Sequence, residues 1–171
     1  PEIPEAFPLP ARIFLNGQLY GLATNAAAGK PALEWSHLPA PPTGELQLAG
    51  SGIYRLILHD KVPLQEPDTT VVLDQPGLTA KVPTGNYRQE ILWRRSEQAA
   101  AVNTEHAVSV VVAAGKSTPL EIGSALTNQV ALGRQGSTLS LSYKLLGANG
   151  AAYTLYPQDR TKPPQFKVLK H

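Results

Sequence analysis

Turn-forming residues divide this chain into short segments, and this punctuation constrains the fold more than any other feature of the sequence. The 14 glycines and 16 prolines are spread along the 171 residues, and turn signals recur about every 8–12 residues, as in all-β proteins. Between them lie roughly ten or eleven apolar-rich segments that fit the two-residue period of a strand better than the period of a helix. Only residues 96–106 could hold a helical turn, or a polar connection. The pattern predicts an all-β, mostly antiparallel β-sandwich.

Two Asn-Gly dipeptides mark expected hairpins. Asn16-Gly17 and Asn149-Gly150 each separate two apolar-rich runs, and Asn-Gly tolerates the positive φ angles of a type I′ turn. Just before the second, "STLSLSYKLLG" (137–147) alternates cleanly. Its leucines and Tyr143 should share one side of a strand, with the serines and the lysine mostly facing outward.

The tetrapeptide Gly-x-Tyr-Arg occurs twice, at Gly52–Arg55 and Gly85–Arg88. Both copies stand where a glycine turn enters a strand, so the simplest interpretation is two neighbouring strands with one packed tyrosine each. In the alternative interpretation, Tyr54 and Tyr87 form a platform that binds a ligand.

One region resembles a known family. The segments "GLTAKVPTGNYRQEILW" (77–93) and "VSVVVAAGKSTPLEIG" (108–123) follow the order of features in small transthyretin-like sandwiches. Such sandwiches occur as carboxypeptidase-regulatory-like and collagen-binding B-type modules of extracellular bacterial proteins. Pro83 would fix φ on entry to the turn and Gly85 would adopt a conformation awkward for other residues, so that Tyr87 can bury its ring. The first strand of such modules is replaced here by "GELQLAGSGIYRLIL".

The resemblance covers residues 44–123 and implies an immunoglobulin-like or transthyretin-like sandwich in an extracytoplasmic setting. It carries over no catalytic residue. We expect an N-terminal arm and hairpin at 1–24, the sandwich at 25–124, and an appended β unit at 125–171. Because the last unit has too few strands to bury both faces of its own sandwich, it either extends the first sheet or is incomplete.

Composition excludes several classes of site. The chain contains no cysteine and no methionine, so disulfides and cysteine chemistry are excluded, and we expect a processed chain whose secretory signal has been removed. No apolar run approaches the roughly 18 residues of a membrane span. The periplasm, the cell surface or the medium is the expected location.

Charge is divided unevenly along the chain. Residues 1–80 hold four Lys or Arg and eight Asp or Glu, a net charge of −4, whereas residues 81–171 hold eleven and five, a net charge of +6. The basic residues are dispersed singly and no aromatic-basic cluster accompanies them, so we predict no nucleic-acid binding.

No catalytic constellation stands out. The histidines His37, His59, His106 and His171 are far apart in sequence, and adjacent strand residues face opposite ways, so no chelate is evident. We predict no metal, no cofactor and no enzymatic activity. A hydrolase whose site is assembled across loops is the alternative; it requires a histidine within hydrogen-bond reach of a carboxylate and a hydroxyl.

The expected function is therefore structural or protein-binding. The residues chosen as ligand-binding candidates are Trp35, Trp93, Tyr54 and Tyr87. If the tryptophans are exposed, they could stack on sugar rings of a surface glycan, which is the first alternative; core packing is the other interpretation. The second alternative is a subunit of an extracellular assembly, either a homo-oligomer or a hetero-oligomer, joined by pairing of strand edges.

Overall fold

The computed structural model of the chain describes residues 9–25, 32–50, 52–60, 68–95, 99–103, 108–122, 125–147 and 150–157. Within these ranges the chain forms strands and turns and no helix. The first seven strands are β1 (Arg12–Leu15), β2 (Gln18–Asn25), β3 (Ala32–His37), β4 (Thr43–Leu48), β5 (Ile53–Asp60), β6 (Thr69–Asp74) and β7 (Thr79–Pro83). The others are β8 (Gly85–Arg95), β9 (Ala99–Asn103), β10 (Ser109–Val112), β11 (Ser117–Leu120), β12 (Thr127–Gln135), β13 (Thr138–Leu146) and β14 (Ala152–Pro157).

The strands form two sheets. The large sheet has eleven strands in the order β12-β13-β14-β9-β8-β5-β6-β1-β2-β3, with β10 also paired to β8, and the small sheet has the order β11-β4-β7. The pairs are antiparallel except β1 with β6 and β11 with β4. The prediction of an all-β, mostly antiparallel sandwich is confirmed.

The main hydrophobic core lies between the two sheets. The large sheet contributes Phe14, Leu56, Leu58, Val71 and Leu92, among others, and these pack against the side chains of the small sheet and of the segment after it. The latter are Leu46, Leu48, Val82, Leu120 and Ile122. Alternation explains the arrangement, because every second residue of β4 (positions 44, 46 and 48) is buried.

A second apolar cluster lies on the other face of the large sheet. It contains Ile13, Ile57, Val72 and Val102, with Leu15, Tyr20 and Leu22 packed against it. The central strands of the large sheet are therefore apolar on both faces. This explains why "LIL" of β5 reads as a continuous apolar run and not as an alternation.

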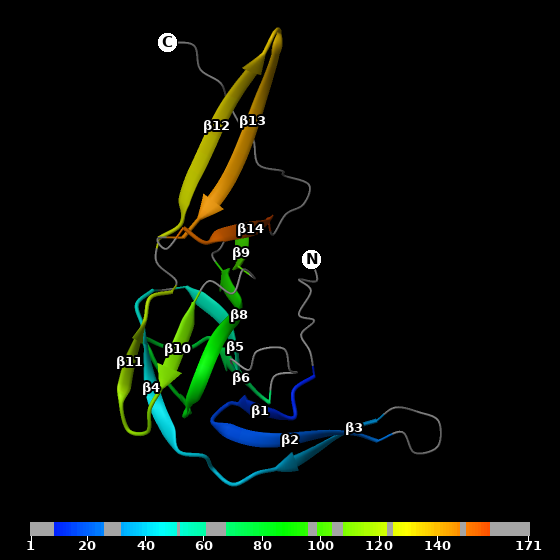
Figure 1. Ribbon diagram of the computed structural model, residues 1–171, viewed down its shortest axis with the longest axis vertical. Coiled ribbons are helices and arrows are strands. Elements are labelled where there is room, and N and C mark those ends of the chain that lie inside the picture. The colour runs from blue at the N-terminus through cyan, green and yellow to red at the C-terminus, as the bar shows by residue number, and fades with distance from the viewer. Residues whose placement is uncertain are drawn as a thin grey trace.

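Both ends of the large sheet extend past the packed layers. Figure 1 shows the β12–β13 hairpin projecting away from the body at one end, while β2 and β3 extend sideways at the other. Strand β14 pairs with β9 through Thr154–Val102 and its neighbours, so residues 152–157 continue the large sheet. Strand β1 joins the same sheet by its parallel pairing with β6.

Local turn chemistry follows the sequence closely. Asn16 and Gly17 both have positive φ, 51° and 80°, and they join β1 to β2 as a type I′ turn. Gly150, with φ of 78°, lies in the turn between β13 and β14, where the Gly150 N–H donates to the Gly147 carbonyl. Both hairpins predicted from Asn-Gly are confirmed.

The role predicted for Gly85 was wrong in its physical cause. Gly85 is not among the glycines with positive φ. A Cβ at this position would instead lie 2.8 Å from Cζ of Tyr87. The residue must be glycine because the tyrosine ring folds back over it, and not because the backbone is left-handed.

Other expectations differ from the structure or lie outside it. The helical turn considered within residues 96–106 does not form at Ala99–Asn103, which is strand β9, since its backbone pairs with both β8 and β14. The N-terminal arm before Leu9 and the last expected strand, at 166–171, lie outside the described residues.

Candidate functional site

Exposed apolar side chains gather at the two ends of the large sheet. Ten large hydrophobic residues of the described ranges are exposed, and seven of them lie on β3, β12 and β13. The seven are Leu33, Trp35, Val130, Leu132, Leu139, Leu141 and Tyr143. A concentration of apolar surface at one place on a folded chain marks a site of interaction more often than scattered residues do.

The β12–β13 hairpin is exposed on both faces. Every residue of β12, and β13 as far as Lys144, is exposed. The register pairs Val130 with Tyr143 and Leu132 with Leu141, so these side chains share one face. The opposite face carries small and polar residues, namely Gln129, Ala131, Gly133, Ser140, Ser142 and Lys144.

This hairpin departs from the expected burial of β13. The alternation of leucine and serine is present in the register, but Leu139 and Leu141 are exposed because no described strand packs over them. The hydroxyl of Tyr143 donates to Oδ1 of Asn128 across the hairpin, at 2.7 Å. The hairpin is thus a hydrogen-bonded arm with one apolar face.

The other end of the sheet carries an aromatic group. Trp35 is 51% exposed on β3, and the ring of Tyr20 contacts it at a centroid distance of 5.8 Å and 78°. Tyr20 also contacts the ring of His37, at 4.7 Å and 50°. Because Tyr20 packs against the second apolar cluster, it fixes the exposed rings of β3 to the body of the protein.

The four candidate ligand residues do not come together. Tyr87 is 1% exposed and belongs to the main core, whereas Tyr54 is partly exposed near the start of β5. Since β5 and β8 are antiparallel and Tyr87 faces Asp60, the two tyrosines lie at opposite ends of neighbouring strands. Trp93 lies on β8, and its side chain is outside the described set. Trp35 is the exposed candidate of the three whose side chains are described.

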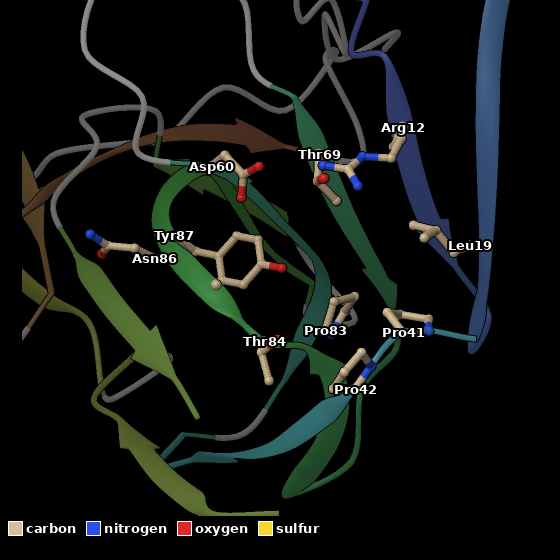
Figure 2. A pocket seen from close by; sticks show the side chains of 11 residues that line it. Arg12, Leu19, Pro41, Pro42, Asp60, Thr69, Pro83, Thr84, Asn86 and Tyr87 are labelled. Atoms are coloured by element: carbon tan, nitrogen blue, oxygen red, sulfur yellow. The ribbon is translucent and has the colours of Figure 1, made fainter. Parts of the chain in front are cut away.

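A pocket of about 460 Å³ opens where the two layers separate. Figure 2 shows polar groups along one wall and prolines along another. The polar wall has Arg12, Asp60, Thr69 and the Tyr87 hydroxyl, and the apolar wall has Leu19, Pro41, Pro42 and Pro83. Thr84, Gly85 and Asn86, in the turn that the resemblance singled out, complete the lining.

Charged groups of the polar wall influence the pKa of their neighbours. Burial raises the pKa of the Asp60 carboxyl above its usual range, although hydrogen bonds from Thr69 and the charge of Arg12 oppose the shift. Burial, and then the charge of Asp60, also raises the pKa of the Tyr87 hydroxyl. Arg12 in turn forms an ion pair with Asp68. A half-buried carboxylate beside a protonated phenol can accept and donate hydrogen bonds to a small polar group.

Sequence reasoning missed this pocket. Arg12, Asp60 and Thr69 come from three different strands, and the parallel pairing of β1 with β6 places Arg12 opposite Thr69. Nothing in the local sequence around Asp60 distinguishes it from other strand-end acids. The turn Val82–Tyr87 was the only available signal.

The hydrolase alternative requires a histidine beside a carboxylate and a hydroxyl, and two of the four histidines, His37 and His59, lie in the described ranges. His59 is buried, and its Nδ1 lies 3.7 Å from Oε2 of Glu90, beyond hydrogen-bond length. His37 is exposed on β3, whereas His106 and His171 lie outside the described residues. In the described part of the chain, no three histidine or acidic residues are placed to hold a metal ion.

Comparison with known proteins gives no family. No protein-family model matches the chain, nor does any curated protein or solved structure. Among the described residues, no helix has the length and apolarity needed to cross a membrane.

Proposed function

We propose that this chain is a non-catalytic β-sandwich module that binds protein partners through the two ends of its large sheet. The observation that carries the proposal is the placement of seven of the ten exposed large hydrophobic side chains on β3, β12 and β13. A strand at the edge of a sheet offers backbone donors and acceptors to another chain. Apolar side chains beside such an edge add the specificity and the burial that strand addition needs.

The setting we propose is extracytoplasmic, within a larger assembly. The resemblance of residues 44–123 to transthyretin-like modules of extracellular proteins supports this setting. Fractionation of the cells that make the chain tests it: the chain should be recovered from the envelope or the medium. Recovery in the cytosol contradicts it.

Site-specific photo-crosslinking tests the interaction function. A photoreactive phenylalanine at position 132 or 33 should crosslink to another polypeptide in the cells that make the chain, because both positions lie on uncovered apolar strands. The matched control is position 78, where Leu78 is 71% exposed but lies away from both sheet ends. Equal crosslinking at positions 132, 33 and 78, or none at all, contradicts the proposal.

One observation favours carbohydrate binding as a second candidate. Trp35 is 51% exposed, and Tyr20 packs against its ring at an interplanar angle of 78°, so an exposed aromatic surface is held in place where a sugar could stack. A glycan array tests this function: binding should disappear in Trp35→Ala and persist in Leu78→Ala. An array without any bound glycan contradicts it.

A further inference from the structure

We propose that β12 of one copy of this chain pairs with β3 of a second copy. The inference rests on the proposed function and names the partner of the two sheet ends. Both strands are terminal in the large sheet, so each has a described neighbour on one side only, β13 for β12 and β2 for β3. Within the described residues, no strand pairs with the outer sides of β12 and β3, where the N–H and C=O groups of every second residue can bond to an added strand.

The two strands can pair edge to edge in an antiparallel register that brings their apolar side chains onto the same face. In this register Leu132 stands opposite Leu33, and Val130 stands opposite Trp35. One row of apolar side chains then crosses four strands, because Val130 already pairs with Tyr143 within its own copy and Trp35 pairs with Leu22. The neighbouring row adds Leu141, Leu132 and Leu33. A slip of one residue would place each apolar side chain on the polar face of its partner.

The opposite face of this pairing is compatible as well. There Glu34 stands opposite Ala131, and Ser36 stands opposite Gln129. The small side chain of Ala131 leaves room for the carboxylate of Glu34, and no two charges of the same sign meet across the strands.

The distribution of charge favours pairing of β12 with β3 over pairing of β12 with a second β12. The β12–β13 hairpin carries Arg134 and Lys144 and no acidic residue, whereas the single charged residue of β3 is Glu34. The chain as a whole divides in the same sense, with −4 in residues 1–80 and +6 in residues 81–171. Pairing β12 with a second β12 would bring two basic hairpins together, so the electrostatic field favours β12 with β3.

The contact joins two different surfaces and leaves one unused end on each outer copy. Head-to-tail contacts of this kind close into a ring or continue as a chain. The shared strand length is the six residues of β3, about 20 Å. A contact along one strand of this length buries less surface than a standard interface, which buries roughly 1,600 Å². We therefore expect the association to be reversible and to increase with protein concentration.

Light scattering coupled to size-exclusion chromatography tests the pairing on the purified chain. The mass should rise with concentration to at least twice the 18.3 kDa of one chain. Leu132→Lys, at a side chain that is 61% exposed, should leave the fold intact and block β12; Leu33→Lys, at one that is 42% exposed, should block β3. Each variant alone should be monomeric at every concentration.

Mixing the two variants gives the decisive result. The Leu132→Lys chain keeps an intact β3 and the Leu33→Lys chain keeps an intact β12, so the mixture should form a one-to-one dimer and nothing larger. Restored dimerisation also shows that neither variant lost its mass by misfolding. Val111→Lys is the matched control, because Val111 is 65% exposed on β10, away from both ends, and its substitution should leave the mass unchanged.

Three results overturn the inference. They are a wild-type chain that is monomeric at all concentrations, a Leu33→Lys chain that still dimerises through β12 alone, and a mixture of variants that stays monomeric. If the purified chain is monomeric while position 132 still crosslinks to another polypeptide in cells, self-pairing is wrong and the proposed function stands. If neither experiment detects a contact, both are wrong.

Discussion

The contact between Gly85 and Tyr87 gives the sharpest test of how the sandwich is packed. A Cβ on residue 85 would lie 2.8 Å from Cζ of Tyr87, and the shortest ordinary contact of this kind is 3.4 Å, so the overlap is 0.6 Å. The ring is 1% exposed and packed in the main core, so it can move aside only toward the pocket that its hydroxyl lines. Overpacking of a filled core costs about 1–3 kcal/mol.

We therefore expect Gly85→Ala to lower the free energy of unfolding by about 1–3 kcal/mol. In a chain of this length each kcal/mol corresponds to roughly 2–4 °C, so the melting temperature should fall by about 2–12 °C. Urea denaturation followed by circular dichroism measures the effect as a lower midpoint at an unchanged m-value. Gly77→Ala is the control, since the nearest atom to its Cβ, the Thr79 carbonyl oxygen, is 3.9 Å away.

A double-mutant cycle separates steric overlap from backbone effects. Tyr87→Ala removes the ring and should itself cost about 3–5 kcal/mol. In that background Gly85→Ala should become stabilising by about 0.5–1 kcal/mol, because alanine is preferred over glycine in a strand once the clash is gone. An equal cost of Gly85→Ala in both backgrounds would refute the explanation.

Three further predictions address the pocket, the buried polar network and a turn. Because burial raises the folded-state pKa of Asp60 above its unfolded value, its contribution to stability is complete at low pH and is lost as pH rises through the folded pKa. Asp60→Asn should therefore remove that loss, so that the difference in unfolding free energy between variant and wild type grows from acid to neutral pH; a difference that does not change with pH contradicts the assignment. Asn103→Leu should cost about 1–3 kcal/mol in urea denaturation, because buried Asn103 accepts from Gln89 at 2.5 Å and donates to the Ala152 carbonyl at 2.7 Å, joining β8, β9 and β14; a neutral effect would show that this network adds nothing. Gly17→Ala should cost about 1–2 kcal/mol by differential scanning calorimetry, because residue 17 has a φ of 80° and open space around it, so the cost is backbone strain alone.

Much of the fold was predictable because it is encoded locally. The alternation in residues 138–146 and the Asn16-Gly17 dipeptide specify a strand and a type I′ turn through side-chain direction and backbone φ, which depend on neighbouring residues only. The doubled Gly-x-Tyr-Arg was also interpreted correctly as two neighbouring strands, since β5 and β8 pair directly.

The candidate sites were predictable only in part. Trp35 was named from its residue type and is exposed at the end of the sheet, but the apolar arm of β12 and β13 was not singled out. Its leucines follow the same alternation as a buried strand, and alternation indicates a face without saying what covers that face. The sequence contains no local signal for exposure of this kind.

The sequence by itself determined which residues extend, where they turn and which side chains share a face. Tertiary structure alone decided that β1 lies parallel to β6, that β14 continues the sheet from β9, and that Arg12, Asp60 and Tyr87 meet at one pocket. The physical reason is that turns and faces depend on interactions between residues a few positions apart. Strand pairing depends instead on contacts between segments far apart along the chain, which form only when the whole set of strands packs together.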